Sequence, residues 1–181
     1  MLCGIDEAGR GPIAGDLVIA GCILNSEVKG LNDSKKLTEK KRETLFEEII
    51  QKSTYHIAKF SAKQIDEIGI SKCLASGLRE IMKNIPDVEY LFDGNTTFGV
   101  EGLTTMVKAD GKVAEVSAAS ILAKVTHDRD IKKEALKYPE YHFEKHKGYG
   151  TKLHVEMIKK HGYCEIHRRT YKLKALEGTL F

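Results

Sequence analysis

Hydrophobic residues recur along the chain at two spacings, one typical of strands and one typical of helices. Short apolar and β-branched runs predict strands over residues 2–5, 17–24, 54–60, 88–92 and 103–108. Apolar residues three and four apart predict helices over residues 38–52, 62–84, 113–136 and 151–161. Within 62–84 we expect two short helices that break near Gly69. This order favours an α/β fold in which helices pack on a mixed sheet over an all-parallel doubly wound sheet.

The composition is that of a single globular domain. A chain of 181 residues that is 41% hydrophobic can bury one core and is too short for two ordinary ones. No apolar run approaches the ~20 residues that a bilayer-spanning helix needs, and the N-terminus lacks the pattern of a secretory signal. The four cysteines are scattered, which fits reduced thiols better than disulfides. We therefore expect a soluble, cytoplasmic protein without membrane contact.

The basic residues are concentrated in the last part of the chain. The net charge of +3 is too small to indicate nucleic-acid binding by itself. Residues 142–181, however, hold nine Lys and Arg against four Asp and Glu, and five of the seven histidines. We expect residues 1–141 to form the main domain and residues 142–181 a basic helical extension of it. That extension either faces phosphates or is a solvated helical tail.

Acidic residues stand where predicted strands end. They are Asp6, Glu7, Asp93 and Asp110, each beside a glycine or a loop. Functional sites collect at such strand ends. Successive side chains on a regular strand point to opposite faces, so Asp6 and Glu7 can serve one site only if the strand bends. The nearby glycines permit such a bend.

Three or four carboxylates that converge in one cleft repel one another unless cations lie between them. Oxygen ligands select Mg²⁺ or Mn²⁺ over zinc. Two such ions can activate a water and stabilise the leaving oxygen of a phosphodiester. Each acidic residue considered alone is more often a turn residue, so the spacing by itself leaves both interpretations open.

Seven sequence blocks resemble those of ribonuclease HII, a type 2 ribonuclease H. The first and most specific is Gly4–Pro12. The others follow in the family's order: Asp33–Leu37, Asp93–Asn95, Lys108–Asp110, Ser117–Thr126, Lys147–Thr151 and His167–Arg169. The resemblance extends over residues 4–169.

The resemblance implies a ribonuclease H-like fold for residues 1–141 and a metal-dependent nuclease. Its metal-binding catalytic carboxylates would be Asp6, Glu7, Asp93 and Asp110, with two Mg²⁺ or Mn²⁺ ions in the catalytic complex. The enzyme would cut the RNA strand of RNA/DNA hybrids and nick duplex DNA on the 5′ side of embedded ribonucleotides. The products would carry a 3′-hydroxyl and a 5′-phosphate. The implied role is removal of ribonucleotides and RNA primers during DNA replication and repair.

The resemblance also implies residues that bind the substrate. The segment Gly9, Arg10 and Gly11 matches the family's reader of the 2′-hydroxyl, the group that separates RNA from DNA locally. Tyr149 matches a tyrosine that packs against the nucleotide next to the ribonucleotide; alternatively, it is a loop aromatic packed on the C-terminal helix. Candidates for contacts with backbone phosphates are Lys35, Lys36 and Lys124, of which Lys35 is the best, although lone lysines are usually only solvated.

Further residues lie in these blocks with supporting roles. They are Asp128, Lys124 and Arg169, and for Asp128 an ion pair on a helix surface is an equal alternative. The chain departs from the family at His127, where arginine is usual, and after Arg169, where a proline is often found. Both departures lie in or near the expected nucleic-acid face.

Other interpretations remain. A zinc site could combine His142, His146, Cys164 and His167, whose pairs have plausible spacings. A non-catalytic nucleic-acid binding module would lack the carboxylates, and a junction resolvase would not need a 2′-hydroxyl reader. We expect a monomer. The last residues, Leu176–Phe181, resemble tail peptides that dock on sliding clamps, or else they are terminal core packing.

Overall fold

The computed structural model describes residues 1–176 and contains one sheet in the strand order β3-β2-β1-β4-β5. The strands are β1 (Leu2–Ala8), β2 (Leu17–Leu24), β3 (Ser53–Phe60), β4 (Glu89–Asp93) and β5 (Leu103–Met106). β1, β2 and β3 pair antiparallel, whereas β4 is parallel to both β1 and β5. The predicted mixed sheet is confirmed.

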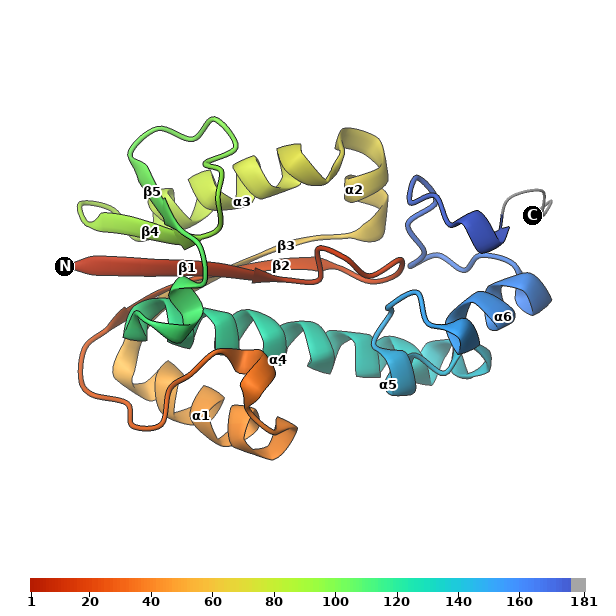
Figure 1. Ribbon diagram of the computed structural model, residues 1–181, viewed down its shortest axis with the longest axis horizontal. Helices are drawn as coiled ribbons and strands as arrows, with labels where there is room; N and C mark the ends of the chain where they lie inside the picture. Colours follow the sequence, from red (N-terminus) through yellow and green to blue (C-terminus); the bar gives the residue numbers. More distant parts are fainter. Residues whose placement is uncertain (177–181) are drawn as a thin grey trace.

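Helices cover both faces of this sheet (Figure 1). On one face lie α1 (Glu39–Lys52) and α4 (Ala114–Lys137), and on the other lie α2 (Ala62–Ile68) and α3 (Ile70–Asn84). Gly69, at a φ of 86°, ends α2 and begins α3. The predicted break is therefore correct, but α3 runs for 15 residues and is not short. The apolar side of α3 packs against the sheet, and this burial stabilises a helix longer than the sequence indicated.

The central strand and α4 approach each other very closely at Gly4. A Cβ atom on Gly4 would lie 2.3 Å from both the carbonyl carbon of Glu115 and the amide nitrogen of Val116. Only glycine permits this contact between two backbones. The contact sets α4, and the loop that precedes it, against the middle of β1.

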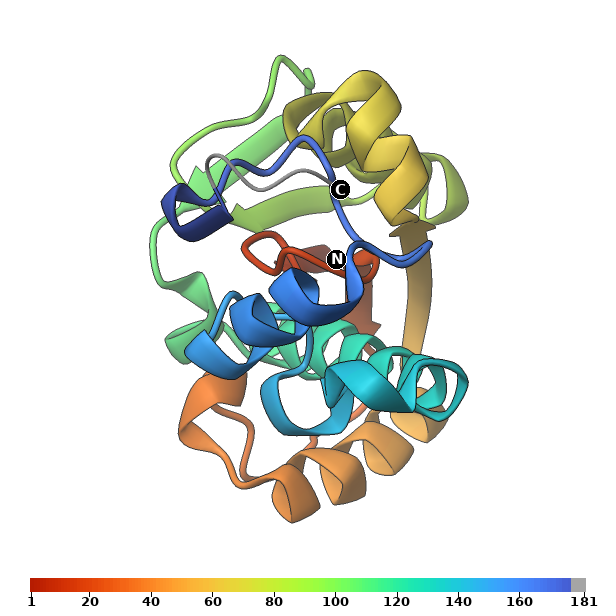
Figure 2. The same ribbon diagram turned by 90° about the vertical axis from the view of Figure 1, so that its right-hand side faces the viewer.

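The C-terminal segment packs across the far end of α4 and the loop between β1 and β2 (Figure 2). It contains α5 (Phe143–His146) and α6 (Lys152–His161). A separate apolar cluster joins it to the rest of the chain through Ile13, Ile131, Phe143, Ile158 and Leu176. The division at residue 141 stays a prediction. The predicted clamp-docking tail lies outside the described residues, except for Leu176.

None of the helices in residues 1–176 combines the length and the apolar character that a membrane span requires.

Candidate active site

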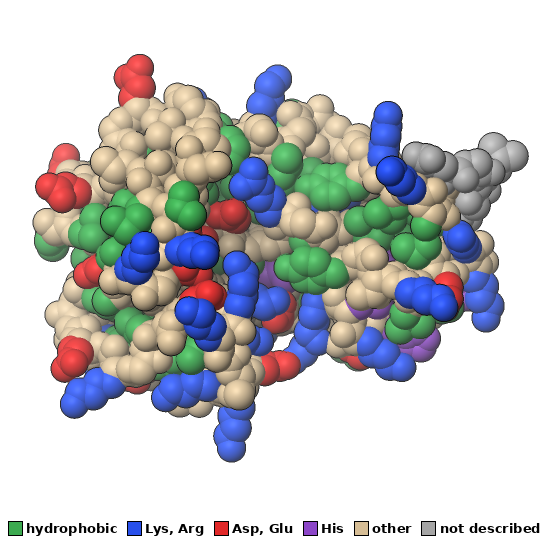
Figure 3. Space-filling model, viewed as in Figure 1, with side chains coloured by type: hydrophobic (Ala, Val, Ile, Leu, Met, Phe, Trp, Pro, Cys, Tyr) green, Lys and Arg blue, Asp and Glu red, His purple; other side chains and the backbone are tan. Residues whose placement is uncertain are grey.

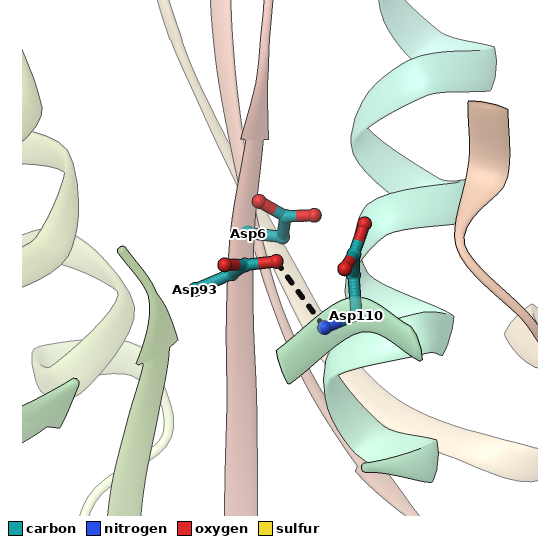
Figure 4. Close-up of side chains that lie close together, drawn as sticks. All are labelled: Asp6, Asp93 and Asp110. Atoms are coloured by element: carbon teal, nitrogen blue, oxygen red, sulfur yellow. Dashed lines mark hydrogen bonds between the residues drawn. The ribbon is translucent and has the colours of Figure 1, made fainter. Parts of the chain in front are cut away.

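Three aspartates from distant parts of the chain converge beside the end of β4 (Figure 4). Asp6 lies in β1, Asp93 ends β4, and Asp110 lies in a 3₁₀ turn before α4. One carboxylate oxygen of each lies within 4.8 Å of those of the other two. In the described part of the chain, no other group of His, Cys, Asp and Glu meets this criterion for a metal site.

Backbone hydrogen bonds orient the carboxylate of Asp93. It accepts one from the amide of Lys108, at 3.0 Å, and one from the amide of Asp110, at 3.2 Å. Lys108 adopts a left-handed conformation, which turns the chain after β5 back toward β4. The hydroxyl of Ser117 in α4 donates to the carbonyl of Asp110 and ties the turn to the helix. Hydrogen bonds of the Asp110 backbone thus fix the position of this aspartate.

Burial and repulsion by neighbouring carboxylates raise the pKa values of Asp6 and Asp110. The pKa of Asp6 is raised well above its ordinary value by burial first and then by the charges of Glu7 and Asp93. Burial, Asp93 and Asp33 raise the pKa of Asp110 to about 6. A carboxylate in this position is stabilised by a cation, which would lower these pKa values again. The cluster is thus chemically suited to a hard divalent ion.

Glu7 reaches the same cleft from the other face of β1. The pairing of β1 with β2 continues regularly to Ala8, so both residues line the cleft without the bend that the sequence suggested they would need. Alternation then puts Asp6 on the α4 face and Glu7 on the opposite face. Both line one cleft because the pairing of β4 with β1 ends at Ile5, which leaves β1 uncovered beyond that residue.

The carboxylate of Glu7 has one oxygen without a partner. Its Oε2 atom is buried and accepts no hydrogen bond from residues 1–176. The guanidinium of Arg10 lies 3.8 Å from the other oxygen. Burial raises the pKa of Glu7, and the charge of Arg10 opposes that rise. An orphaned buried carboxylate oxygen at the edge of an aspartate cluster is a further indication of a cation site.

The cleft brings the predicted substrate-binding residues next to these acids. It is lined by Asp6, Glu7, Gly9, Arg10, Gly11, Ser34, Lys35, Ser120, Lys124 and Tyr149. Lys35 also lines an adjoining hollow that contains Asp93 and Asp110. Lysine and arginine side chains gather around the acidic ones near the middle of this face (Figure 3). Negative metal ligands inside a basic rim are the pattern expected of a site that binds a phosphate backbone.

Tyr149 stands directly beside the Gly9–Gly11 segment. A Cβ atom on Gly11 would lie 3.8 Å from the ring of Tyr149, and the ammonium of Lys124 lies 5.9 Å from the centre of that ring. The side chain of Tyr149 is 42% exposed, so its ring borders the cleft and is not packed away on α6. The alternative interpretation of Tyr149 as a packed loop aromatic is therefore wrong.

A chain of histidines holds the backbone of Tyr149. The Nδ1 atom of His154 lies 2.9 Å from the Tyr149 carbonyl and must donate to it, so its Nε2 accepts from Nε2 of His167, also at 2.9 Å. His167 in turn accepts from the amide of Cys164 through Nδ1. Each ring carries one proton in this chain. Burial lowers the pKa of His154 to about 4 and that of His167 to about 3, which keeps both neutral.

These histidine hydrogen bonds also argue against the alternative interpretation of His142, His146, Cys164 and His167 as a zinc site. His167 uses both nitrogens in hydrogen bonds, and so does His146, toward Tyr141 and Gly148. His142 is half-buried and lies near Glu144 instead, with its Nδ1 3.7 Å from a carboxylate oxygen of Glu144. The four residues have plausible spacings in the sequence, but the fold uses the ring nitrogens of His146 and His167 for structural hydrogen bonds.

The three supporting residues occupy different environments. Asp128 is buried, not on the helix surface, and binds Lys124 at 3.0 Å and His127 at 3.1 Å. Lys124 lines the cleft, as expected of a phosphate contact. Arg169 is exposed, does not line the cleft, and places its guanidinium 5.9 Å from the ring of Tyr163.

Sequence reasoning missed two buried polar residues at the site. Ser120 donates to the hydroxyl of Ser34 at 2.8 Å and lines the cleft together with Asp6. Arg168, adjacent to the predicted Arg169, is one of the most deeply buried side chains of the described residues. Both stand within the recognised blocks, but the local sequence does not indicate the distant segments to which they donate hydrogen bonds.

Comparison with known proteins gives a consistent result. The family model of Ribonuclease HII matches residues 3–174. The ribonucleases HII of Sulfurovum sp. (strain NBC37-1) and Aliarcobacter butzleri (strain RM4018) are 61% and 59% identical to the chain. These matches cover 99% and 97% of the chain, and 96% and 92% of the two relatives.

Solved structures agree with these relatives. The PCNA:RNase HII complex from Archaeoglobus fulgidus matches with a TM-score of 0.80 at 29% identity, over 93% of this chain and 92% of that one. Ribonuclease H2 from Pyrococcus horikoshii OT3 matches with a TM-score of 0.76 at 31% identity, over 94% and 93%. The likeness thus extends over nearly the whole of each chain.

Proposed function

The chain belongs to the ribonuclease HII family, and we propose that it is an endonuclease that recognises single ribonucleotides in duplex DNA as well as longer hybrids. As a ribonuclease H it is a hydrolase that acts on RNA paired with DNA. The proposed cut lies on the 5′ side of the ribonucleotide and leaves a 3′-hydroxyl and a 5′-phosphate. One observation supports this most: Asp6 and Glu7 line one cleft with the Gly9–Gly11 segment and Tyr149, and Asp93 and Asp110 line the hollow that adjoins it.

The proposed cofactor is a pair of Mg²⁺ or Mn²⁺ ions held by Asp6, Asp93 and Asp110, with Glu7 beside them. The raised pKa values of Asp6 and Asp110 and the unpartnered oxygen of Glu7 fit such ions. When bound, divalent ions supply Lewis-acid stabilisation of the phosphate and lower the pKa of a bound water.

The protein's own groups position the substrate. Tyr149 presents an exposed ring face for a nucleotide to stack on, and Lys35 and Lys124 supply positive charge for the backbone phosphates. At Gly11, beside the ring of Tyr149, no Cβ stands between the backbone and the cleft, so a sugar can approach the backbone closely. A 2′-hydroxyl at that point can exchange hydrogen bonds with peptide groups, whereas deoxyribose cannot.

The proposed biological role is removal of ribonucleotides and RNA primers during DNA replication and repair, by a monomer in the cytoplasm. The four cysteines of the chain are all unpaired, in keeping with a reducing compartment.

Contact with a sliding clamp is a separate proposal. The matched Archaeoglobus fulgidus structure is a complex of RNase HII with PCNA. In this chain the contact would use the tail after Leu176. Deletion of residues 178–181 should then abolish capture of the enzyme by an immobilised clamp while leaving cleavage unchanged. Equal capture of the full and shortened chains would contradict this proposal.

The decisive experiment is cleavage of an end-labelled DNA duplex that contains one ribonucleotide, with Mg²⁺, with Mn²⁺ and with chelator. We expect a metal-dependent nick on the 5′ side of the ribonucleotide. If the enzyme cleaves long RNA/DNA hybrids but not this duplex, the proposed activity on single ribonucleotides is wrong. A cut on the 3′ side of the ribonucleotide would contradict the proposed cleavage position.

A further inference from the structure

Arg168 is buried to 1% exposure directly behind the Gly9–Gly11 segment. A guanidinium has five N–H donors in a rigid fork. All five donate hydrogen bonds. Nε and Nη2 donate to the Gly15 carbonyl at 3.0 and 2.9 Å, and Nη2 also donates to the Gly9 carbonyl at 2.6 Å. Nη1 donates to the Arg10 carbonyl at 3.2 Å and to the Tyr171 hydroxyl at 3.3 Å. The acceptors belong to the loop and to one tyrosine.

No carboxylate of the described residues forms an ion pair with Arg168. Burial of a charge is costly unless its donors are all satisfied, and here backbone carbonyls alone satisfy most of them. An apolar side chain would fill the same space without that cost. The hydrogen-bond geometry, rather than packing, therefore accounts for an arginine at this position.

A second group holds the same loop. The hydroxyl of Tyr171 donates to the carbonyl of Arg10 at 2.8 Å while it accepts from Arg168. The backbone of the segment is also tied down, because the amide of Arg168 donates to Ile13 at 2.8 Å and Gly15 donates to Ile166 at 2.9 Å. The carbonyl groups of Gly9 and Arg10 thus face residues 166–171, which hold the loop through both side-chain and backbone hydrogen bonds.

This arrangement determines where the loop's amides point. In a trans peptide the N–H lies opposite the carbonyl. Because the carbonyls of Gly9 and Arg10 face Arg168, the N–H groups of Arg10 and Gly11 face the other way. Neither has an acceptor within residues 1–176. The cleft and the ring of Tyr149 border the loop at Gly11.

We infer that Arg168, assisted by Tyr171, is a positioning residue that sets the ribonucleotide specificity of the cleft by holding the amides of Arg10 and Gly11 toward the sugar. Arg168 touches neither the substrate nor the aspartate cluster in this arrangement. The inference rests on the proposed function, in which the Gly9–Gly11 segment meets the 2′-hydroxyl.

Two substitutions test this inference. Tyr171→Phe removes one hydroxyl and keeps the ring, and Arg168→Lys keeps the charge but replaces five fixed donors with three on a flexible stem. The matched controls are Tyr138→Phe and Arg129→Lys, whose polar atoms bind glutamates outside the cleft. If Arg168→Lys does not fold, Tyr171→Phe still tests the loop.

The readout is the ratio of affinities for two duplexes of the same sequence, one with a single ribonucleotide and one all DNA, measured with Ca²⁺ in place of Mg²⁺. We expect Tyr171→Phe to lower this ratio about threefold to tenfold, as loss of one hydrogen bond does. Arg168→Lys should lower it by about tenfold or more, and both should keep the wild-type affinity for Mn²⁺. The two controls should keep the wild-type ratio.

The outcomes separate the inference from the function on which it rests. If the wild-type protein binds both duplexes equally, the proposed reader is wrong and the inference with it. If the wild-type protein discriminates and both folded variants discriminate equally well, Arg168 is only a structural residue and the inference is overturned. A lower melting temperature of the variants with an unchanged affinity ratio would also overturn it.

Discussion

Burial has two opposing effects on the carboxylates of this site. Burial removes the water that would screen Asp6, Asp93 and Asp110 from one another, and the pKa values of Asp6 and Asp110 rise as a result. The same burial strengthens their attraction for a cation. The residues that destabilise the metal-free protein are thus the ones that would bind metal, as is common at functional sites.

Asp93→Asn should lower cleavage by about 1,000-fold or more while the protein stays folded. The amide oxygen of asparagine can still accept a hydrogen bond from Lys108 or Asp110, but it carries no charge for a cation. Cleavage of the single-ribonucleotide duplex and thermal melting measure the two effects. The control is Asp87→Asn, at an exposed position with a φ of 61° that asparagine tolerates. Near wild-type cleavage by Asp93→Asn would contradict the metal assignment.

Tyr149→Ala should lower kcat/KM on a single embedded ribonucleotide by about tenfold to a hundredfold, because stacking on one base is lost. Binding of Mn²⁺, followed by calorimetry, should not change, since Tyr149 lies outside the aspartate cluster. Tyr55→Ala is the matched control, as Tyr55 is similarly exposed, at 40%, on β3. An equal loss of metal affinity and activity would count against the stacking role.

Elements position the site through their ends and their closest contacts. The pairing of β4 with β1 ends at Ile5, one residue before Asp6, and the 3₁₀ turn before α4 brings Asp110 opposite Asp93. The height of α4 on the sheet depends on the contact at Gly4. The packing of these elements therefore sets the distances between carboxylates that lie far apart in the sequence.

Gly4→Ala should destabilise the protein by about 2–3 kcal/mol, because a methyl group would overlap the α4 backbone and push the helix off β1. Chemical denaturation measures the free energy of unfolding. Gly111→Ala is the control, since a Cβ there meets no atom within 4 Å. Equal stability of both variants would show that α4 moves freely, contrary to the packing described here.

At the scale of the whole molecule, pH links the site to stability. The pKa of Asp110 is about 6 in the folded protein against an ordinary 3.8, so the folded state holds a proton that the unfolded state releases between those values. Stability of the metal-free protein should therefore fall as pH rises from about 4 to 6. Asp110→Asn should flatten this dependence in melts across that range.

Divalent ions should reverse this trend, because they compete with the proton at the same carboxylates. The gain in Tm on addition of Mn²⁺ should be larger at pH 7 than at pH 5. Thermal melts with and without Mn²⁺ at both pH values measure it, with Asp93→Asn as the variant that should lose the gain. An identical gain at both pH values would mean that the ion binds elsewhere.

Much of this molecule could be predicted from local patterns. Strands and helices follow from apolar spacing, because each element must bury one face. The ribonuclease H-like mixed sheet was predicted and is confirmed. The motif blocks identified the family, which the comparisons confirm. The position of Asp93 at the end of a strand was also visible, whereas Asp6 lies inside β1 and Asp110 in a 3₁₀ turn after β5.

What the sequence by itself determined is which residue types the chain offers and in which element each one stands. Tertiary structure decided which of them meet. Glu7 and Asp6 lie on opposite faces of a regularly paired β1. The ring nitrogens of His154 and His167 form structural hydrogen bonds, and Arg168 is buried whereas Arg169 is exposed. The physical reason is that burial and hydrogen-bond partners depend on contacts between distant segments, such as Gly9 with Arg168, and local spacing carries no information about those contacts.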